Sequence, residues 1–243
     1  MLEQKIDSIK DRTEVIILPE MFSTGFSMRP EILAESMDGE VVKWMQKIAS
    51  NKKAIIAGSL IIVEDEKYYN RFIWMQPDGK YGFYNKRHLF AYAGEDQHYT
   101  GGDKRLIVSV KGFRILLQVC YDLRFPVWSR HNFNDSASQL EYDALIYVAN
   151  WPERRSHAWK TLLQARAIEN QSYVIGVNRV GNDGNGIYHS GDSMVINAMG
   201  DVLYHKEREE DVFTIVLEKD HIEEVRKKLP FWKDGDKFIL LNE

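Results

Sequence analysis

The sequence predicts an α/β fold in which helices pack on the faces of β-sheets. Residues 14–18 and 143–148 are short, almost continuous apolar runs, which are typical of strands covered on both faces. Residues 157–171 instead repeat apolar side chains at helical spacing. Because β–β and β–α units follow one another without a linker, a repeat or a break in composition, we expect one domain over residues 1–243.

The N-terminal half begins with a predicted helix and continues mainly as strands. Helices over 2–11 and 40–50 would each gather their apolar residues on one face. Pro77-Asp78-Gly79 has the residues of a tight turn, and Lys111-Gly112 indicates a hairpin between two apolar runs. The strands expected in this half are 14–18, 54–63, 68–76, 81–84, 106–110 and 113–119.

The C-terminal half repeats the pattern with longer helical segments. Besides 157–171, we expect a helix over 219–228. The glycine-rich stretch 181–186 predicts a turn or mobile loop, since the Lys-Ser/Thr of a phosphate-binding loop does not follow it. The strands expected in this half are 143–148, 172–177, 193–196, 202–205 and 212–217.

The composition excludes several classes of protein. Of the 243 residues, 44% are hydrophobic and 28% charged, which excludes disordered, collagen-like and coiled-coil chains. No apolar run approaches the roughly 18 residues of a membrane span, and the charged N-terminus lacks an apolar signal region. The net charge of −4, with the signs interspersed, leaves no basic stripe for nucleic acid. We therefore expect a small-molecule partner, and neither nucleic acid nor membrane.

The single cysteine, Cys120, is the most informative feature of the composition for the location and the chemistry of the protein. One cysteine excludes an intramolecular disulfide and a cysteine-rich zinc site, and it fits a reducing, cytoplasmic location. Cys120 ends the run 113–119 and precedes a predicted helix start with Asp122 as its N-cap. Free N–H groups and a helix dipole at such an elbow would favour the thiolate. A buried structural cysteine fits the same context equally well.

Glu20 follows the predicted strand 14–18 in the same way. In α/β folds, ligand sites form just beyond the carboxyl ends of parallel strands. Its neighbours Leu18, Met21 and Phe22 would partly desolvate the carboxylate and raise its pKa, which suits a general base. A solvated loop glutamate is the ordinary alternative.

Lys86 comes just after the predicted strand 81–84, with aromatic residues on both sides, so it can point into a lined pocket. By itself it would be interpreted as a surface charge, and Glu95 as a loop carboxylate. Together, however, Cys120, Glu20 and Lys86 provide a nucleophile, a base and an oxyanion stabiliser, the set needed for acyl transfer through a thioester. Their spacing in the sequence leaves open whether they converge.

Three segments around these residues resemble the nitrilase superfamily of carbon–nitrogen hydrolases, and they occur in the order found in that superfamily. They are Leu-Pro-Glu-Met-Phe-Ser-Thr-Gly-Phe at 18–26, Tyr-Asn-Lys-Arg-His-Leu-Phe at 84–90 and Val-Cys-Tyr-Asp-Leu-Arg-Phe-Pro at 119–126. Asn150-Trp151-Pro152, Arg155 and residues 164–170 also resemble superfamily segments. The resemblance extends from about residue 14 to the C-terminus, and it is greatest to bacterial omega-amidases of the YafV type.

The resemblance implies both a fold and a reaction. The fold would be a four-layer α-β-β-α sandwich that forms a homodimer through a helical face. The catalytic residues would be Glu20, Lys86 and Cys120, with Glu95 as an accessory glutamate that orients Lys86 or assists proton transfer. The reaction would release ammonia from the terminal amide of a small 2-oxo acid, 2-oxoglutaramate or 2-oxosuccinamate, without a metal or cofactor.

Further residues would bind the substrate. We expect the backbone N–H of Tyr121 to join Lys86 in holding the oxyanion. Arg124 matches an arginine that meets the substrate carboxylate in omega-amidases, although a structural salt bridge is nearly as good an interpretation. Phe22 and Trp151 complete the residues expected to line the substrate site.

One feature departs from the superfamily pattern. Its members begin with a strand before the first helix, whereas this sequence starts within that helix, at Met1-Leu2-Glu3. The resemblance therefore implies a sheet in which the first strand is missing, with the gap beside 14–18. We expect this edge of the sheet to be the least stable part of the fold. If the gene encodes residues upstream of Met1, a protein that includes them should have a higher melting temperature.

Other classes of function remain open at this point. Another hydrolase of the superfamily would act on N-carbamoyl amino acids or aliphatic amides, and a non-catalytic binding protein could keep the same fold. A metal-dependent hydrolase would need a ligand cluster, but the seven histidines are scattered and no His-Glu-x-x-His occurs. The sequence around Cys120 also lacks the surroundings typical of papain-like or caspase-like cysteine proteases.

Overall fold

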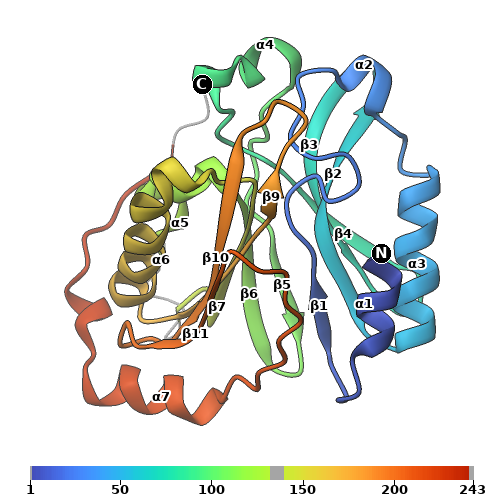
Figure 1. The fold of residues 1–243 in the computed structure, drawn as a ribbon. Helices are drawn as coiled ribbons and strands as arrows, with labels where there is room; N and C mark the ends of the chain where they lie inside the picture. The colour runs from blue at the N-terminus through green and yellow to red at the C-terminus, as the bar shows by residue number, and fades with distance from the viewer. Residues whose placement is uncertain (1, 132–139, 241–243) are drawn as a thin grey trace.

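Two β-sheets lie face to face at the centre of the protein, with helices on both outer surfaces (Figure 1). The structure, a computed structural model, describes residues 2–131 and 140–240. The first sheet has the order β1-β2-β3-β4, and the second has the order β11-β10-β8-β7-β6-β5, with β9 paired to β10. The strands of the first sheet are β1 (Val15–Ile17), β2 (Ile55–Glu64), β3 (Lys67–Met75) and β4 (Tyr81–Asn85). Those of the second are β5 (Ile107–Val110), β6 (Phe113–Val119), β7 (Ala144–Ala149), β8 (Tyr173–Asn178), β9 (Val180–Asn182), β10 (Tyr188–Ile196) and β11 (Val202–Glu207).

Successive side chains of a strand point to opposite faces of the sheet, so alternate residues pack either between the two sheets or against the outer helices. In β6, Ile115 and Leu117 face the first sheet and join the central core, while Leu116 faces outward. β7 alternates in the same way, because Ile146 is in the central core and Leu145 in the outer one. The apolar runs seen in the sequence are thus strands with two buried faces, as expected for parallel neighbours such as β6, β7 and β8.

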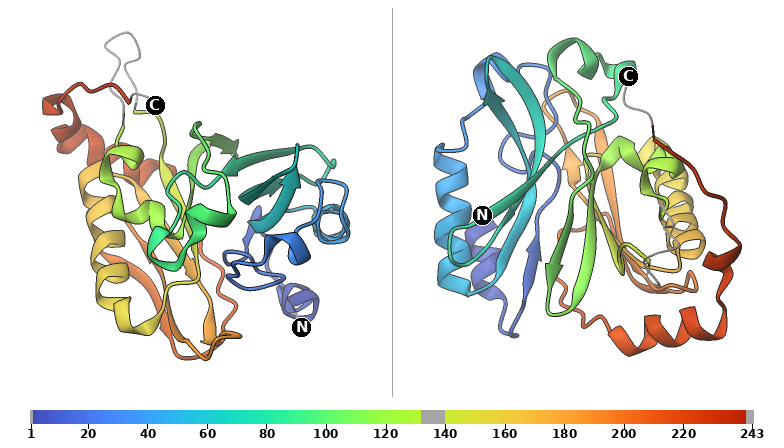
Figure 2. Two further views of the ribbon diagram at one scale, coloured as in Figure 1. Left: turned by 90° about the horizontal axis from the view of Figure 1, so that it is seen from above. Right: turned by 180° about the vertical axis from the view of Figure 1, so that it is seen from behind.

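Helices cover the outer face of each sheet, which completes four layers (Figure 2). On the first sheet, α3 (Glu40–Lys52) and α1 (Leu2–Ser8) pack through residues such as Met45 and Ile6. On the second, α6 (Ser156–Asn170) packs through Trp159 and Leu163. The remaining helices are α2 (Pro30–Leu33), α4 (Glu95–His98), α5 (Pro126–Ser129) and α7 (Lys219–Lys228), together with the 3₁₀ helices η1 (Ala91–Ala93), η2 (Cys120–Arg124), η3 (Glu153–Arg155) and η4 (Phe231–Asp234). This arrangement confirms the predicted α-β-β-α sandwich.

The expected strand at 212–217 is wrong. Residues 212–217 form no strand: Val212, Phe213 and Thr214 are all exposed, and only Ile215 and Leu217 pack against the central core, on either side of the 81% exposed Val216. A segment rich in β-branched and aromatic residues becomes a strand only where a neighbouring strand pairs with its backbone, and among the described residues no strand pairs with this segment. β1 likewise has β2 as its one strand partner within the described part of the chain.

The glycine-rich stretch 181–186 belongs to a hairpin. β9 pairs antiparallel with β10, and the Gly186 N–H donates to the Asp183 carbonyl to close the turn. The turn that the composition predicts is therefore present, with the first two residues of the stretch in β9.

Of the helices in residues 2–131 and 140–240, none combines the length and the apolar composition that a membrane span requires.

Candidate active site

Glu20, Lys86 and Glu95 meet in one buried cluster. The Lys86 ammonium donates to Glu20 Oε1 at 3.0 Å and to the Glu95 oxygens at 3.0 and 2.8 Å. Each of the three residues is at most 1% exposed. Glu20 lies three residues after β1 and Lys86 directly after β4, so the strand-end positions noted in the sequence do bring these charges together.

The charges of the cluster depend strongly on one another. Burial by itself would lower the pKa of Lys86, but the carboxylates of Glu20 and Glu95 more than offset this, and the pKa is raised. Burial also raises the pKa of Glu95, and Lys86 opposes that shift. The Lys86 ammonium thus forms ion pairs with two carboxylates. The side-chain amide of Asn70 bridges the same carboxylates, since it donates to Glu20 Oε1 at 2.7 Å and to Glu95 Oε1 at 3.3 Å.

Cys120 lies beside this cluster, at the elbow between β6 and η2. Its φ of 44° is in the left-handed region, an unfavourable conformation for a residue with a side chain and one that is common at functional sites. Burial and then the charge of Glu20 raise the pKa of the thiol well above its usual range, although Lys86 acts in the opposite direction. The expectation that the elbow favours the thiolate is therefore wrong for the resting state. The thiol keeps its proton, and a base must remove it.

Asp122 was expected to be a helix N-cap, but the helix begins two residues earlier, at Cys120. Its buried carboxylate instead holds the elbow, since Oδ2 accepts the Val119 N–H at 2.9 Å and the Tyr84 hydroxyl at 2.8 Å. Oδ1 accepts the His88 backbone N–H at 3.0 Å and lies 2.8 Å from His88 Nδ1. This one carboxylate therefore ties the nucleophile strand to the strand and loop that carry Lys86.

We expect the Asp122→Ala substitution to lower the free energy of unfolding by about 3 kcal/mol or more, because it leaves at least two buried donors unsatisfied at about 1–3 kcal/mol each. Urea denaturation of the variant would measure the loss. The matched control is Asp78→Ala, which removes an exposed carboxylate from a turn and should leave the urea midpoint almost unchanged. Equal stability of the two variants would show that Asp122 does not hold the elbow.

Glu20 is held by hydrogen bonds from Asn150, a role that the sequence did not reveal. The next residue, Met21, also has a positive φ, of 43°, and its N–H donates to Ser59 Oγ at 2.9 Å. Beyond β7, the Asn150 N–H donates to Glu20 Oε2 at 2.8 Å, and its amide donates to the Glu20 carbonyl at 2.7 Å. Glu20 is thus surrounded by polar donors as well as by the apolar neighbours that were expected.

Of the residues predicted to bind substrate, Arg124 and Trp151 contact each other, whereas Phe22 lies elsewhere. The Arg124 guanidinium packs 4.9 Å from the centre of the Trp151 ring, and among the described residues it forms no salt bridge. Trp151 is fixed by two bonds, from its N–H to Asn178 Oδ1 at 2.7 Å and from its indole to the Arg155 carbonyl at 2.8 Å. Phe22 instead packs against Trp44 of α3, with ring centres 5.9 Å apart, on the outer face of the first sheet. These contacts give Phe22 no support as a substrate residue.

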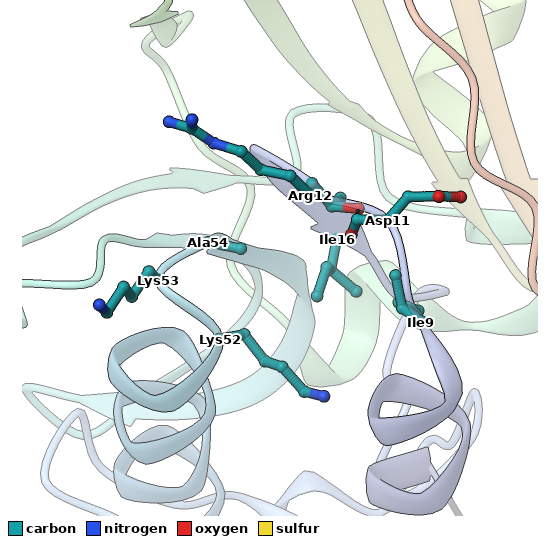
Figure 3. Close-up of a pocket in the computed structure, with 8 residues that line it drawn as sticks. Ile9, Asp11, Arg12, Ile16, Lys52, Lys53 and Ala54 are labelled. Atoms are coloured by element: carbon teal, nitrogen blue, oxygen red, sulfur yellow. Dashed lines mark hydrogen bonds between the residues drawn. The ribbon is translucent and has the colours of Figure 1, made fainter.

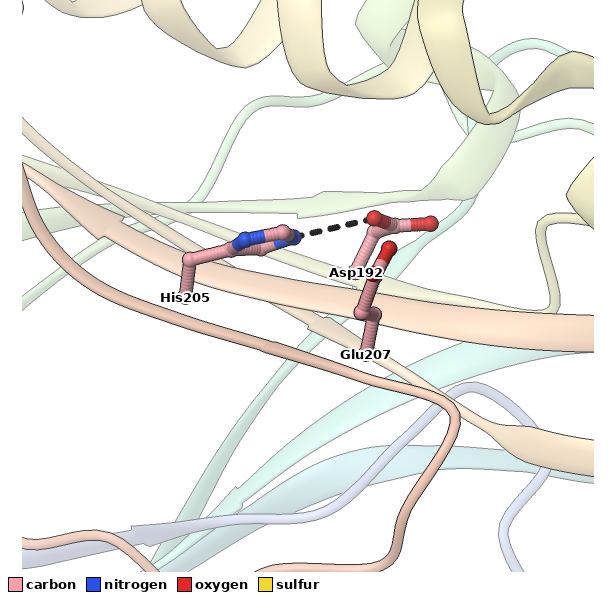
Figure 4. Close-up of side chains that lie close together, drawn as sticks. All are labelled: Asp192, His205 and Glu207. Atoms are coloured by element: carbon pink, nitrogen blue, oxygen red, sulfur yellow. Dashed lines mark hydrogen bonds and ion pairs between the residues drawn. The ribbon is translucent and has the colours of Figure 1, made fainter.

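Two other features lie apart from this cluster. A pocket of about 330 Å³ between α1, β1 and the end of α3 includes Ile9, Arg12 and Lys52, but none of the predicted site residues (Figure 3). Asp192, His205 and Glu207 have the spacing of metal ligands (Figure 4). Their central oxygen, Asp192 Oδ1, is already engaged by His205 Nε2 at 2.9 Å and by the Lys160 ammonium at 3.2 Å. The proximity of Asp192 and His205 is therefore explained by an ion-pair network with Lys160.

The sequence reasoning missed Asn70 and the role of Asn150. Asn70 occupies the interior of β3, where asparagine is depleted, and a buried amide inside a strand was the available signal. Asn150 follows directly after β7, at the same end of the second sheet as Cys120, which follows the parallel strand β6. Phe26 was also missed, and its ring centre lies 5.4 Å from the Lys86 ammonium.

Comparisons with known proteins show which proteins the chain is similar to. The profile of the carbon–nitrogen hydrolase family matches residues 2–227. The chain is 46% identical over 239 residues to omega-amidase YafV of Escherichia coli K12, covering 98% of this chain and 90% of that protein. It is 30% identical to the 2-oxoglutaramate amidase of Bacillus subtilis 168, over 94% of this chain and 87% of the relative.

A solved structure is similar over the same range. XC1258 from Xanthomonas campestris, a carbon–nitrogen hydrolase superfamily protein solved with an arsenic adduct in its active site, superimposes with a TM-score of 0.96. The two sequences are 42% identical, and the match covers 99% of this chain and 91% of the other.

Proposed function

Because the chain belongs to the carbon–nitrogen hydrolase family, we propose that it is a thiol amidase that releases ammonia from a small 2-oxo acid amide, 2-oxoglutaramate or 2-oxosuccinamate. The observation that carries the proposal is the buried Glu20–Lys86–Glu95 cluster beside the Cys120 elbow. The choice of substrate is supported by relatives named omega-amidase and 2-oxoglutaramate amidase.

The first half of the reaction forms a thioester. Glu20 takes the proton of the Cys120 thiol, and the sulfur attacks the amide carbonyl carbon while the C=O electron pair moves to the oxygen. The Lys86 ammonium and the Tyr121 backbone N–H, which lies in the first turn of η2, hold this oxyanion. Protonated Glu20 gives its proton to the nitrogen as the C–N bond breaks, so ammonia leaves and the acyl group stays on sulfur.

The second half returns the enzyme to its starting state. Glu20, again a carboxylate, takes a proton from water, and the resulting hydroxide attacks the thioester carbonyl. The oxyanion collapses, the C–S bond breaks, and the sulfur recovers the proton from Glu20. Glu95 positions Lys86 throughout, since it accepts two of the three ammonium hydrogens, one of which would shift to the oxyanion. Each step uses groups of the chain and water, and no metal or cofactor enters the mechanism.

Ammonia release over a panel of compounds tests the proposal. The panel contains 2-oxoglutaramate, 2-oxosuccinamate, the plain dicarboxylic monoamides, an N-carbamoyl amino acid, an aliphatic amide and a nitrile. We expect the 2-oxo acid amides to give the highest kcat/KM. A clear preference for the carbamoyl compound or the aliphatic amide would instead identify another hydrolase of the family, and no turnover of any compound would favour a binding protein on this fold.

The homodimer expected from the family resemblance belongs to the same proposal. On the α6 side of the molecule, Ile168 is 54% exposed and Met199 48% exposed, and Gly200 lies directly under the Ile168 side chain. Such exposed apolar residues would be covered by a second copy. Analytical ultracentrifugation should therefore give twice the mass of one chain, and Ile168→Asp should shift the protein towards monomer. A wild-type protein that sediments as a monomer would rule out this interface.

A further inference from the structure

We infer that Arg155 joins Arg124 in a two-arginine site that binds the substrate carboxylate and disfavours amides carrying an α-ammonium group. The inference rests on the proposed amidase function and deepens it, since it names the feature of the acyl group that the site recognises.

Aromatic side chains connect both guanidinium groups to the elbow that carries the nucleophile. Arg155 ends η3, and its guanidinium lies 5.1 Å from the centre of the Phe90 ring. The Phe90 ring packs 4.9 Å from that of Tyr121, the residue that follows Cys120. On the other side, the indole of Trp151 donates to the Arg155 carbonyl, and its ring supports the Arg124 guanidinium.

Neither arginine has a counter-ion or a hydrogen bond from its guanidinium within the described residues. This separates them from the other buried or half-buried arginines in 2–131 and 140–240, each of which bonds to a carboxylate or a carbonyl. Those arginines are Arg71, Arg87, Arg105, Arg114, Arg130, Arg166, Arg179 and Arg226. Arg124 ends η2, which begins at Cys120, and Arg155 lies close enough for its charge to interact with both residues. Two such half-buried guanidinium groups with free donors are poised for an anionic ligand.

The electrostatics of the site agree with this geometry. Burial, and then the positive charges of Arg154 and Arg124, lower the pKa of Arg155, so the protein bears a cost for holding this charge. A bound carboxylate would remove that cost. A 2-oxo acid amide brings only a carboxylate, whereas an amino acid amide such as glutamine adds an ammonium group close to two guanidinium groups. The site therefore favours the 2-oxo form by like-charge repulsion as well as by attraction.

The test compares Arg155→Gln with Arg154→Gln, which removes the same charge one residue away from an exposed side chain. Ammonia release is measured with 2-oxoglutaramate, with the uncharged butanamide and with L-glutamine. We expect Arg155→Gln to lower kcat/KM for 2-oxoglutaramate by about 10- to 100-fold, the range for a charge-assisted hydrogen bond. It should change the butanamide rate and the melting temperature little, and it should narrow the preference for 2-oxoglutaramate over glutamine. Arg154→Gln should change every rate by less than about threefold.

A binding measurement keeps the inference testable without turnover. In a Cys120→Ala background, calorimetry should show weaker binding of 2-oxoglutaramate after Arg155→Gln and unchanged binding after Arg154→Gln. If wild-type protein hydrolyses no amide but Arg155→Gln still weakens this binding, the proposed function is wrong and the anion site stands. If Arg155→Gln lowers the rates on charged and uncharged amides equally, or leaves both rates and the binding unchanged, the two-arginine site is overturned.

Discussion

The Cys120→Ala protein should fold normally and release no ammonia from any amide. The sequence contains no second cysteine that could replace the nucleophile, and the substitution removes only one sulfur atom from the elbow. We expect kcat to fall on the order of 10⁶-fold, the loss seen when the nucleophile of a serine hydrolase is removed. Thermal melting would show whether the fold is retained, and ammonia release would measure the loss of turnover.

Mass spectrometry of the wild-type protein with a slowly hydrolysed substrate supplies the complementary result. An acyl adduct should appear on the peptide that contains Cys120 and be absent from the Cys120→Ala protein. Cys120→Ser serves as the control for shape, because it keeps a hydroxyl in place of the thiol while providing a much weaker nucleophile. If folded Cys120→Ala still released ammonia at the wild-type rate, the thioester route would have to be abandoned.

Much of the fold could be predicted from the sequence because the central strands, such as β7 and β8, are buried on both faces. The run at 143–148 corresponds to β7, with every residue buried, and the hairpin around Lys111-Gly112 corresponds to β5 and β6. Residues 212–217 show the limit of such reasoning. Their β-branched and aromatic composition is typical of a strand, but whether a strand forms depends on a pairing partner, which a local pattern does not reveal.

The candidate site could be predicted in part for a similar reason. Glu20 and Lys86 follow strands of the first sheet and Cys120 follows a strand of the second, so each lies just beyond a strand end, where α/β folds form their sites. Their surroundings could not be predicted, because Asn70 and Asn150 approach Glu20 from 50 and 130 residues away in the sequence.

The state of the Cys120 thiol shows how tertiary structure overrides a local expectation. The elbow at the start of η2 favours a thiolate, which is what the sequence around Cys120 suggests. Burial beside the Glu20 carboxylate acts in the opposite direction and prevails. Only the arrangement of the charges in space decides between these effects, and it leaves the thiol protonated until Glu20 acts as a base.

Lys86→Gln should lower kcat by at least about 10²-fold, the usual cost of losing one oxyanion donor. Glutamine can still donate a hydrogen bond, but it provides no positive charge to the oxyanion. The control is Lys80→Gln, because the Lys80 side chain is 81% exposed and lies just before β4, the strand that leads to Lys86. The control should change kcat by less than about threefold, since exposed charges contribute little.

The same substitution should also change how stability depends on pH. Without the ammonium group, Glu20 and Glu95 would be two buried carboxylates in contact with a shared amide, and Glu95, whose pKa burial already raises, would take up a proton. A carboxyl group with a raised folded-state pKa stabilises the fold at low pH and loses that contribution as pH rises through the folded-state value. The Lys86→Gln protein should therefore melt at a higher temperature near pH 5 than near pH 8, by a wider margin than wild type.

These two readouts separate a catalytic lysine from one that only neutralises its neighbours. kcat is measured at a temperature and pH where melting shows the Lys86→Gln protein to be folded, so the loss of rate cannot come from unfolding. A folded Lys86→Gln protein with near-normal kcat would remove Lys86 from the oxyanion site and leave it as a counter-ion for Glu20 and Glu95. A deep loss of kcat in the folded protein, with the pH-dependent melting described above, is the result that the cluster geometry predicts.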